Sequence, residues 1–400
     1  MLPRRDKSQN CEKDPISEWN RLDKHLRRPE ASTMEKVVST VFGCHYHQGH
    51  GGAMKKPENY VGIDVSSQTF TSAIGRIGAK WQIVVKPEQF DNSLEGCTAY
   101  LHWLQEHGAR ANNSIICMEA TGVYNEMLAH FLLVNNYQVS IEPPLRVKRA
   151  FHPEGHKSDP VDSTQISEYA YRFWDELRIW KPRKAILEQI KTLLTAREQF
   201  VKEQAAHKNA LQALKRKVIR TPLAEALHET AIAQLNENAR KIEAEIEKLI
   251  DQDPDFRDTV RLLSSITGVG VLLASYMLVI IKSAPQPLSA KVLAAFIGIC
   301  PYEHTSGSSV HGASTSRHYG PPAVRQLLYL AACSARTHDE KYKQYFYRKV
   351  AEGKPKQLVI NNIANNMLKV MVAVLRSKTP YIRNYQSVNP GMFKMALTRS

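Results

Sequence analysis

Cysteine is scarce in this chain: the six cysteines among 400 residues are scattered without the spacing of a disulfide framework. Such usage is typical of a reduced, intracellular protein. No apolar stretch approaches the ~20 residues that a membrane span needs. Residues 1–5 lack the apolar core of a secretion signal. Together these absences predict a cytoplasmic protein without a membrane partner.

Acidic residues are also in short supply, with 39 Asp and Glu against 54 Lys and Arg, which gives a formal net charge of +15. The imbalance is concentrated at one end. Residues 301–400 hold 15 Lys and Arg but only 4 Asp and Glu. An excess of this size predicts a polyanionic partner, most simply nucleic acid. A well-solvated basic surface without a partner is the alternative.

The length of 400 residues and the 43% hydrophobic content indicate two or three domains with buried cores. We divide the chain into a basic, mobile extension (1–58), an α/β domain (59–180), a pair of long helices (181–254) and a helical C-terminal domain (255–400). A cluster of His and Cys at residues 44–50 has no second cluster at a zinc-site spacing, so a His-rich loop is favoured there.

The α/β domain is predicted from the order of its elements. Short β-branched runs alternate with helical patterns, which indicates a mixed sheet flanked by helices. The expected strands are 60–65, 69–75, 81–86, 114–118 and 137–141, and the expected helices are 91–107 and 123–134.

The remainder of the chain is predicted to be helical. Residues 183–250 contain almost no Gly or Pro and carry apolar residues at helical spacing, with Pro222 between two long helices. An antiparallel coiled coil and a plain helical bundle fit equally well, and either leaves apolar stripes that favour self-association. Farther on, a turn at Gly268 and Gly270 precedes a helix of small residues, as in a helix-hairpin-helix that binds phosphate through backbone N–H groups. A simple tight turn is the alternative.

Four acidic residues form the clearest candidate site. Asp64 and Glu119 each end an apolar strand-like run, and Asp159 and Asp162 lie three apart at the start of a helical stretch. Unpaired carboxylates at strand ends would be costly and would repel one another. Mg²⁺, or Mn²⁺ in its place, relieves both costs and serves phosphodiester chemistry.

A second candidate lies in the basic C-terminal region, where Ser306 precedes a glycine in a loop. Alone, such a pair is usually a turn or a helix cap. Arg317 and Arg325 follow within twenty residues and are suited to holding a scissile phosphate beside the hydroxyl. Ser308 and Ser309 remain alternatives. Further basic residues expected to contact nucleic-acid backbones are Lys341, Lys343, Arg348, Lys349, Lys354 and Lys356.

These two blocks together resemble DEDD transposases of the IS one-ten type, which are bridge-RNA-guided insertion-sequence recombinases related to Piv-type DNA invertases. The resemblance covers roughly residues 60–375. It rests on the motifs around Asp64, Glu119 and Asp159 in the first block. In the second block it rests on the 266–270 turn and on residues 298–307 and 320–332.

The resemblance implies an RNase H-like (RuvC-like) domain whose tetrad, Asp64, Glu119, Asp159 and Asp162, binds Mg²⁺. It implies that Ser306 is a nucleophile that forms a 5′-phosphoserine link, with strand exchange through a Holliday-junction-like intermediate. A structured RNA would pair with donor and target DNA. The assembly would be a homotetramer of dimers with active sites shared between protomers, in the nucleoid of a prokaryote.

Two other hypotheses remain. A metal-dependent junction endonuclease would use water as its nucleophile and leave Ser306 as structure. A non-catalytic nucleic-acid-binding protein, decayed from a transposase, would need none of the acids.

Overall fold

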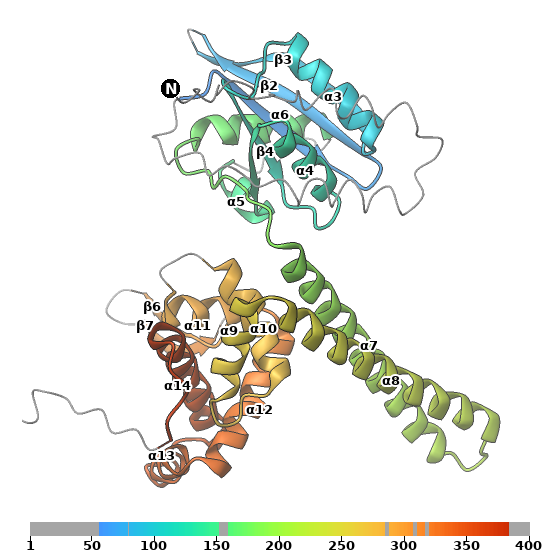
Figure 1. The fold of residues 1–400 in the computed structure, drawn as a ribbon, viewed down its shortest axis with the longest axis vertical. Helices are drawn as coiled ribbons and strands as arrows, with labels where there is room; N and C mark the ends of the chain where they lie inside the picture. Colours follow the sequence, from blue (N-terminus) through green and yellow to red (C-terminus); the bar gives the residue numbers. More distant parts are fainter. Residues whose placement is uncertain are drawn as a thin grey trace, which may run out of the picture. The chain divides into compact units, whose positions relative to one another are not determined.

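A computed structural model describes residues 56–78, 80–151, 159–284, 288–306, 310–316 and 320–383 (Figure 1). The chain divides into two compact units, the first ending at Pro182 and the second beginning at Arg183. Nearly all of the predicted 1–58 extension, including the His-rich cluster, lies outside the described residues.

The first unit contains a mixed five-stranded sheet with the strand order β3-β2-β1-β4-β5. β1 pairs antiparallel with β2 and parallel with β4, and β4 pairs parallel with β5. The five strands lie close to their predicted positions, so the α/β prediction is confirmed. Their bounds are Asn59–Val65 (β1), Thr69–Ile77 (β2), Trp81–Asp91 (β3), Ser114–Glu119 (β4) and Gln138–Glu142 (β5).

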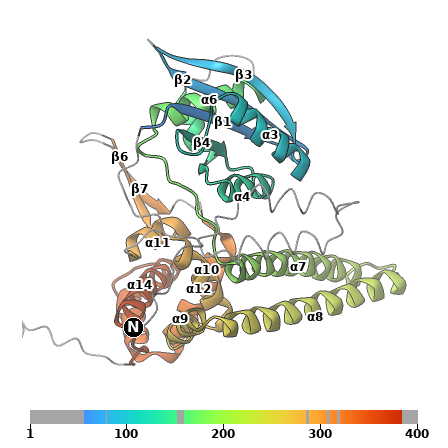
Figure 2. The ribbon, with the colours of Figure 1, turned by 45° about the horizontal axis from the view of Figure 1, so that its top comes forward.

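Helices cover both faces of this sheet (Figures 1 and 2). On one face, Val61 and Ile63 of β1 pack in a single cluster with residues of α3 and α4. On the other, Tyr60 of β1 and Cys117 of β4 pack with α5 and α6. This division follows from the two-residue period of a strand. The helices are Leu94–Glu106 (α3), Glu126–Val134 (α4), Pro144–Arg149 (α5) and Asp159–Arg172 (α6).

The second unit begins with two long helices, α7 (Ala185–Lys215) and α8 (Pro222–Gln252), which run antiparallel (Figure 2). Arg197 pairs with Glu243, and Lys215 pairs with Glu229 farther out, as an antiparallel arrangement requires. Pro222 occupies the first turn of α8, where its missing N–H costs nothing. The sequence therefore predicted the helix pair and its break correctly.

The rest of the second unit is mostly helical and shares one hydrophobic core. α14 is long and apolar enough to cross a membrane by length and composition, but half of its most apolar window is buried inside the unit. Its apolar residues, including Ile363 and Met367, belong to the core. The helices are Pro254–Ser264 (α9), Val271–Ser283 (α10), Ala290–Ile297 (α11), Pro322–His338 (α12), Glu340–Ala351 (α13) and Lys356–Ser377 (α14).

One element of the second unit differs from the all-helical prediction. Pro301–Ser306 (β6) and Val310–Ser316 (β7) form a two-stranded antiparallel sheet. The sequence reads here as a loop because Ser, Gly, His and Thr dominate and no long apolar alternation marks a strand. A hairpin of this composition depends on tertiary anchoring, since an isolated two-stranded hairpin is marginal in water.

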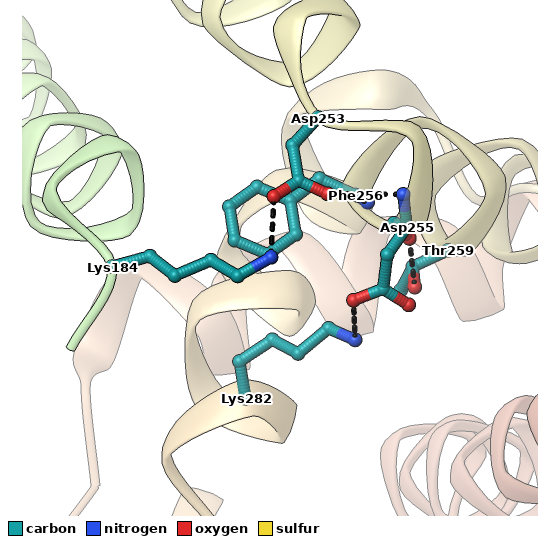
Figure 3. Close-up of polar contacts among 6 residues, drawn as sticks. All are labelled: Lys184, Asp253, Asp255, Phe256, Thr259 and Lys282. Carbon is teal, nitrogen blue, oxygen red and sulfur yellow. Dashed lines mark hydrogen bonds and ion pairs between the residues drawn. The ribbon is translucent and has the colours of Figure 1, made fainter. Parts of the chain in front are cut away.

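The junction of α7, α8 and α9 is held by ion pairs around one aromatic ring (Figure 3). Asp253 ends α8 and caps α9, its Oδ1 accepting from the backbone N–H groups of Asp255 and Phe256. Its Oδ2 lies 2.6 Å from Nζ of Lys184. Asp255 pairs with Lys282 of α10. Both lysine ammonium groups lie within 6 Å of the buried Phe256 ring, at 5.1 and 5.9 Å from its centroid.

These contacts give Asp253 a depressed pKa. Burial alone would raise it, but the hydrogen bonds from Lys184 and from the N–H groups of Phe256 and Asp255 outweigh burial and lower the pKa of Asp253. The unfolded chain, with a pKa of about 3.9 for Asp, therefore takes up this proton before the folded chain does as pH falls. The stabilisation is full above that value and is lost as pH falls through the folded pKa.

Asp253→Ala is expected to lower the free energy of unfolding by about 1–2 kcal/mol near neutral pH, because the variant loses a helix cap and an ion pair. The measurement is urea denaturation of the full chain. The difference from wild type should shrink below about pH 4 as the wild-type carboxylate is protonated. Asp251→Ala, an exposed residue of the same helix, is the control. Equal effects of the two variants would contradict this role.

Candidate active site

Asp64 and Glu119 lie at the same edge of the sheet of the first unit. β1 and β4 are parallel neighbours, and Ile63 pairs with Met118 in their register. Asp64 and Glu119 are the next residues of the two strands. Since the carboxyl ends of parallel strands meet at one edge, two residues 55 apart in sequence become neighbours. The sequence placed both at strand ends but could not show that these strands are adjacent.

Both acids also project to the same face of the sheet. Tyr60 and Cys117 point toward α6, and side chains two or four residues farther along a strand point the same way. This places Asp64 and Glu119 on the α6 face. Each is partly exposed, as a site open to a substrate requires.

The helix α6 brings the other two acids to this edge. A Cβ on Gly62 would lie 2.2 Å from both the carbonyl oxygen of Ser163 and the backbone nitrogen of Ser167. The Ser167 hydroxyl donates to the carbonyl of Tyr60 at 2.7 Å. Residue 167 thus lies beside residue 60, and residue 163 beside residue 62. The helix therefore runs antiparallel to β1, and its first turn, with Asp159 and Asp162, points toward Asp64.

The side chains themselves are only partly described. That of Asp162 is half-buried, and that of Asp159 lies outside the described residues. Among the side chains that the structure describes, no group of three or more His, Cys, Asp and Glu is gathered closely enough to hold a metal ion. Asp64, Glu119 and Asp162 are therefore not gathered as a three-ligand group, although the backbone directs the start of α6 toward the edge where β1 and β4 end. The donor set is chemically suited to Mg²⁺, because carboxylate oxygens are the hard ligands this ion prefers.

A further acid at this edge was missed in the sequence. Glu142 ends β5 and pairs in register with Glu119, so three neighbouring parallel strands carry a carboxylate at their last or penultimate residue. Glu142 is 2% exposed, and its carboxylate accepts hydrogen bonds from Ser140 at 2.9 Å and from Arg146 at 3.1 Å. The signal was present, because Glu142 follows a predicted strand just as Asp64 and Glu119 do.

Arg146 compensates this buried charge. It bridges Glu142 and Glu176 at 3.1 and 3.2 Å, which satisfies the guanidinium on two sides. The neighbouring Cys117 is fully buried. Burial, reinforced by the charge of Glu142, raises the pKa of the Cys117 thiol far above its usual value. Cys117 therefore stays protonated near neutral pH and supplies neither a thiolate ligand nor a nucleophile.

In the second unit, Ser306 is the last residue of β6. Its backbone pairs with Val310, the first residue of β7. The side chain of Ser306, the alternatives Ser308 and Ser309, and Arg317 all lie outside the described part of the chain. The described backbone therefore places the predicted nucleophile at a hairpin tip.

The base of this hairpin is anchored to α11. Gly298 ends α11 with φ +80° and leads the chain into β6. At the other end of the hairpin, a Cβ on Gly320 would lie 2.1 Å from the carbonyl oxygen of Phe296. Arg325 donates to the carbonyl oxygens of Ile297 and Gly320. This predicted nucleic-acid contact thus also ties the end of α11, ahead of the hairpin, to Gly320, the first described residue after it.

The predicted glycine turn lies between α9 and α10. Gly268 has φ +91°, and a Cβ on it would lie 2.4 Å from the carbonyl oxygen of Ala331, so it packs tightly against α12. Gly270 is the N-cap of α10, and a Cβ there would meet nothing within 4 Å. Close packing against α12 explains why residue 268 is a glycine. At Gly270, by contrast, no other atoms crowd the N-terminus of α10.

Most of the predicted basic residues between α13 and the start of α14 are exposed, whereas two of the aromatic residues of α13 are buried. Tyr342 and Phe346 are core residues, at 1% and 5% exposed, while Tyr347 on the same helix is 64% exposed. Lys349 is half-buried and pairs with Glu352. The other predicted contacts are exposed: Lys341, Lys343, Arg348, Lys354 and Lys356.

Comparison with known proteins adds to this geometry. A family profile of DEDD type, described as a transposase of IS110 elements, matches residues 61–218. A second, described as the transposase IS116/IS110/IS902 family, matches residues 260–347. The chain belongs to the IS110 transposase family. It is therefore an enzyme that cleaves and joins DNA.

Relatives of this transposase include proteins of Moraxella and Streptomyces. The pilin gene-inverting proteins of Moraxella lacunata and Moraxella bovis are each 26% identical over 327 residues, covering 81% of this chain and 98% of each relative. An IS110 insertion-element protein of Streptomyces coelicolor is 28% identical over 152 residues, 38% of this chain and 36% of that protein. The resemblance inferred from the motifs is thereby confirmed.

Family membership also bears on the metal and on DNA. DEDD transposases use divalent metal ions in general, and a transposase binds DNA. Both agree with the sequence predictions at this coarser level.

Gly62→Ala should disrupt the site through packing alone. A methyl group there overlaps the backbone of α6, so the helix must move, at a cost of about 3 kcal/mol or more. We expect a lower melting temperature of the first unit and loss of DNA cleavage. The control is Gly78→Ala in the same unit, where the nearest atoms to a Cβ lie at 3.9 Å. A stable Gly62→Ala protein would refute the close β1–α6 packing.

Proposed function

We propose that this transposase is guided by a structured RNA and cuts DNA with two sets of groups, the acids of the first unit and Ser306 of the second. Asp64, Glu119, Asp159 and Asp162 hold Mg²⁺ or Mn²⁺, and Ser306 attacks the scissile phosphate. The protein acts in the cytoplasm, on nucleoid DNA. The observation that carries the proposal is the placement of Asp64 and Glu119 at one edge and face of the sheet, with the first turn of α6 directed toward them.

In the proposed reaction, the Ser306 oxygen bonds to phosphorus and the bond from phosphorus to the 3′-oxygen breaks. The serine proton is lost, and the released 3′-oxygen takes up a proton to become a hydroxyl. The product is a 5′-phosphoserine ester, so attack by a 3′-hydroxyl on this ester reseals a strand without ATP. Serine attack on phosphorus depends on positioning and charge neutralisation more than on a strong base.

The bound cations supply neutralisation of the charge that develops on the phosphoryl and leaving oxygens. The chain's own residues hold the geometry around them. Parallel pairing sets the spacing of the β1 and β4 ends, and α6 is locked to β1 at Gly62. The anchored base of the β6–β7 hairpin fixes the path of the backbone that carries Ser306.

RNA guidance is proposed from the family resemblance and is supported by the basic C-terminal quarter. Exposed Lys and Arg on α13 and the following turn suit phosphate backbones, which carry no sequence information. Base pairing between the guide and DNA would then choose the sites. The aromatic core residues of α13 are unavailable for base stacking, while the exposed Tyr347 remains available.

Self-association is supported by the outer end of the α7–α8 hairpin. Its exposed apolar residues lie around the turn and the first turns of α8. They are Val218 (100% exposed), Ile219 (85%), Leu223 (71%) and Leu227 (63%). Apolar residues gathered in one place on a surface are typical of an interface. We propose that the protein forms a homodimer that assembles into a homotetramer, with active sites that combine the acids of one protomer with Ser306 of another.

Asp64→Asn and Glu119→Gln are each expected to reduce DNA cleavage by at least about 100-fold, because each removes a charged oxygen ligand. Cleavage by the wild-type protein should require Mg²⁺ or Mn²⁺ and stop when EDTA is added. Asp175→Asn, an exposed acid of the same unit, is the control. Full activity of the Asp64 variant would exclude the metal site. Absence of cleavage by the wild-type protein as well would instead favour a decayed, non-catalytic protein.

Ser306→Ala is expected to abolish both strand cleavage and a covalent protein–DNA adduct. The assay uses nicked donor DNA together with RNA transcribed from the non-coding sequence flanking the gene, and the adduct is detected on denaturing gels and located by mass spectrometry. Ser308→Ala and Ser309→Ala are matched controls that should retain the adduct. Cleavage by Ser306→Ala without any adduct would instead establish the water-using junction endonuclease.

A further inference from the structure

Asn92 lies between two elements of the first unit, immediately after β3 and just before α3. Its backbone N–H donates to the carbonyl oxygen of Gln68 at 2.7 Å, which ties it to the β1–β2 turn. The side chain is half-buried. In the sequence, Asn92 falls at the start of the helix predicted over residues 91–107 and is given no role of its own.

The side-chain amide of Asn92 joins the segments that follow two of the predicted metal-binding acids. Its Nδ2 donates to the carbonyl oxygen of Ser66 at 3.0 Å and to that of Tyr124 at 2.9 Å. Ser66 comes two residues after Asp64, and Tyr124 comes five residues after Glu119. One NH₂ group therefore bridges the two loops at the carboxyl edge of β1 and β4.

The chemistry of this contact requires an amide. Two backbone carbonyls need two donor protons at one position, and the side-chain NH₂ supplies both. The Oδ1 atom of Asn92 is buried and accepts no hydrogen bond from any described residue. The two N–H bonds, rather than the oxygen, therefore account for the position of the side chain.

Each bridged segment also makes hydrogen bonds of its own, which connect the bridge to the ends of β1 and β4. Ser66 closes a tight turn, its N–H and hydroxyl both donating to the carbonyl of Thr69. On the other side, the N–H of Ala120 donates to the carbonyl of Glu142 at 2.9 Å, and Asn125 Nδ2 donates to the carbonyl of Glu119 at 3.4 Å. In the described register, β1 and β4 stop pairing at Ile63 and Met118. Beyond that point Asn92 connects the two strand ends.

We infer that Asn92 is a positioning residue that sets the separation of the Asp64 and Glu119 carboxylates for a divalent cation. The inference rests on the proposed function, in which these two acids are metal ligands. Groups that orient metal ligands without touching the metal typically change metal affinity by about 10- to 100-fold when they are removed.

The test compares Asn92→Leu with Asn135→Leu in the full chain. Leucine has the same number of side-chain heavy atoms as asparagine and the same branching at Cγ, but it has no donor. Asn135 makes a similar side-chain bond, from Nδ2 to the Phe131 carbonyl at 2.9 Å, at the end of α4. Mn²⁺ binding is followed by the electron paramagnetic resonance signal of free Mn²⁺. Backbone amide hydrogen exchange is measured separately without metal.

Asn92→Leu should weaken Mn²⁺ binding by about tenfold or more. It should also speed amide exchange in both bridged segments, residues 66–69 and 120–125, while Asn135→Leu does neither. Unchanged Mn²⁺ affinity in Asn92→Leu, or an equal loss in both variants, would overturn the assignment. The wild-type protein should show saturable Mn²⁺ binding that is lost in Asp64→Asn. If it does not, the proposed metal site is overturned and this assignment with it. Faster exchange with unchanged affinity would leave Asn92 as structure only.

Discussion

The approach of α6 to β1 at Gly62 is the constraint on which the first unit depends. Because a Cβ there would overlap the backbone of α6, only glycine lets the helix lie directly on the strand. The hydrogen bond from Ser167 to the Tyr60 carbonyl fixes the position of α6 along the direction of β1. This one contact orients the first turn of α6 toward the ends of β1 and β4. Asp162, in the first turns of α6, is directed toward that edge for the same reason.

The edge is more heavily charged than the tetrad alone suggests. Glu142 extends the row of carboxylates to a third strand, and Arg146 offsets its charge within hydrogen-bonding distance. A buried acid without such a partner would compete for a cation or would stay protonated. The pairing gives the buried Glu142 a partner of opposite charge within the protein. In the second unit, β6 ends at Ser306. The segment that follows the β6–β7 hairpin is held to the end of α11 by the close packing of Gly320 and by a hydrogen bond from Arg325.

Much of the fold could be predicted because its signals are local. The five strands, the break at Pro222 and the strand-end positions of Asp64 and Glu119 all follow from period and turn chemistry. The β6–β7 hairpin could not be predicted, since its residues have no apolar alternation and its stability comes from the contacts at its base. Glu142 also follows a predicted strand, as Asp64 and Glu119 do, but it was not among the predicted site residues. Asn92 carried none, because its partners are backbone carbonyls far away in sequence.

The sequence by itself determined the composition of the candidate site: acids at strand ends, a serine before glycine, and a basic C-terminal quarter. Periodicity and charge reside in neighbouring residues, so they can be read without coordinates. Only the tertiary structure decided which strand ends are neighbours, which face the acids share and which side chains support them. Those properties arise from strand pairing and close backbone packing between segments about a hundred residues apart, such as Tyr60 and Ser167.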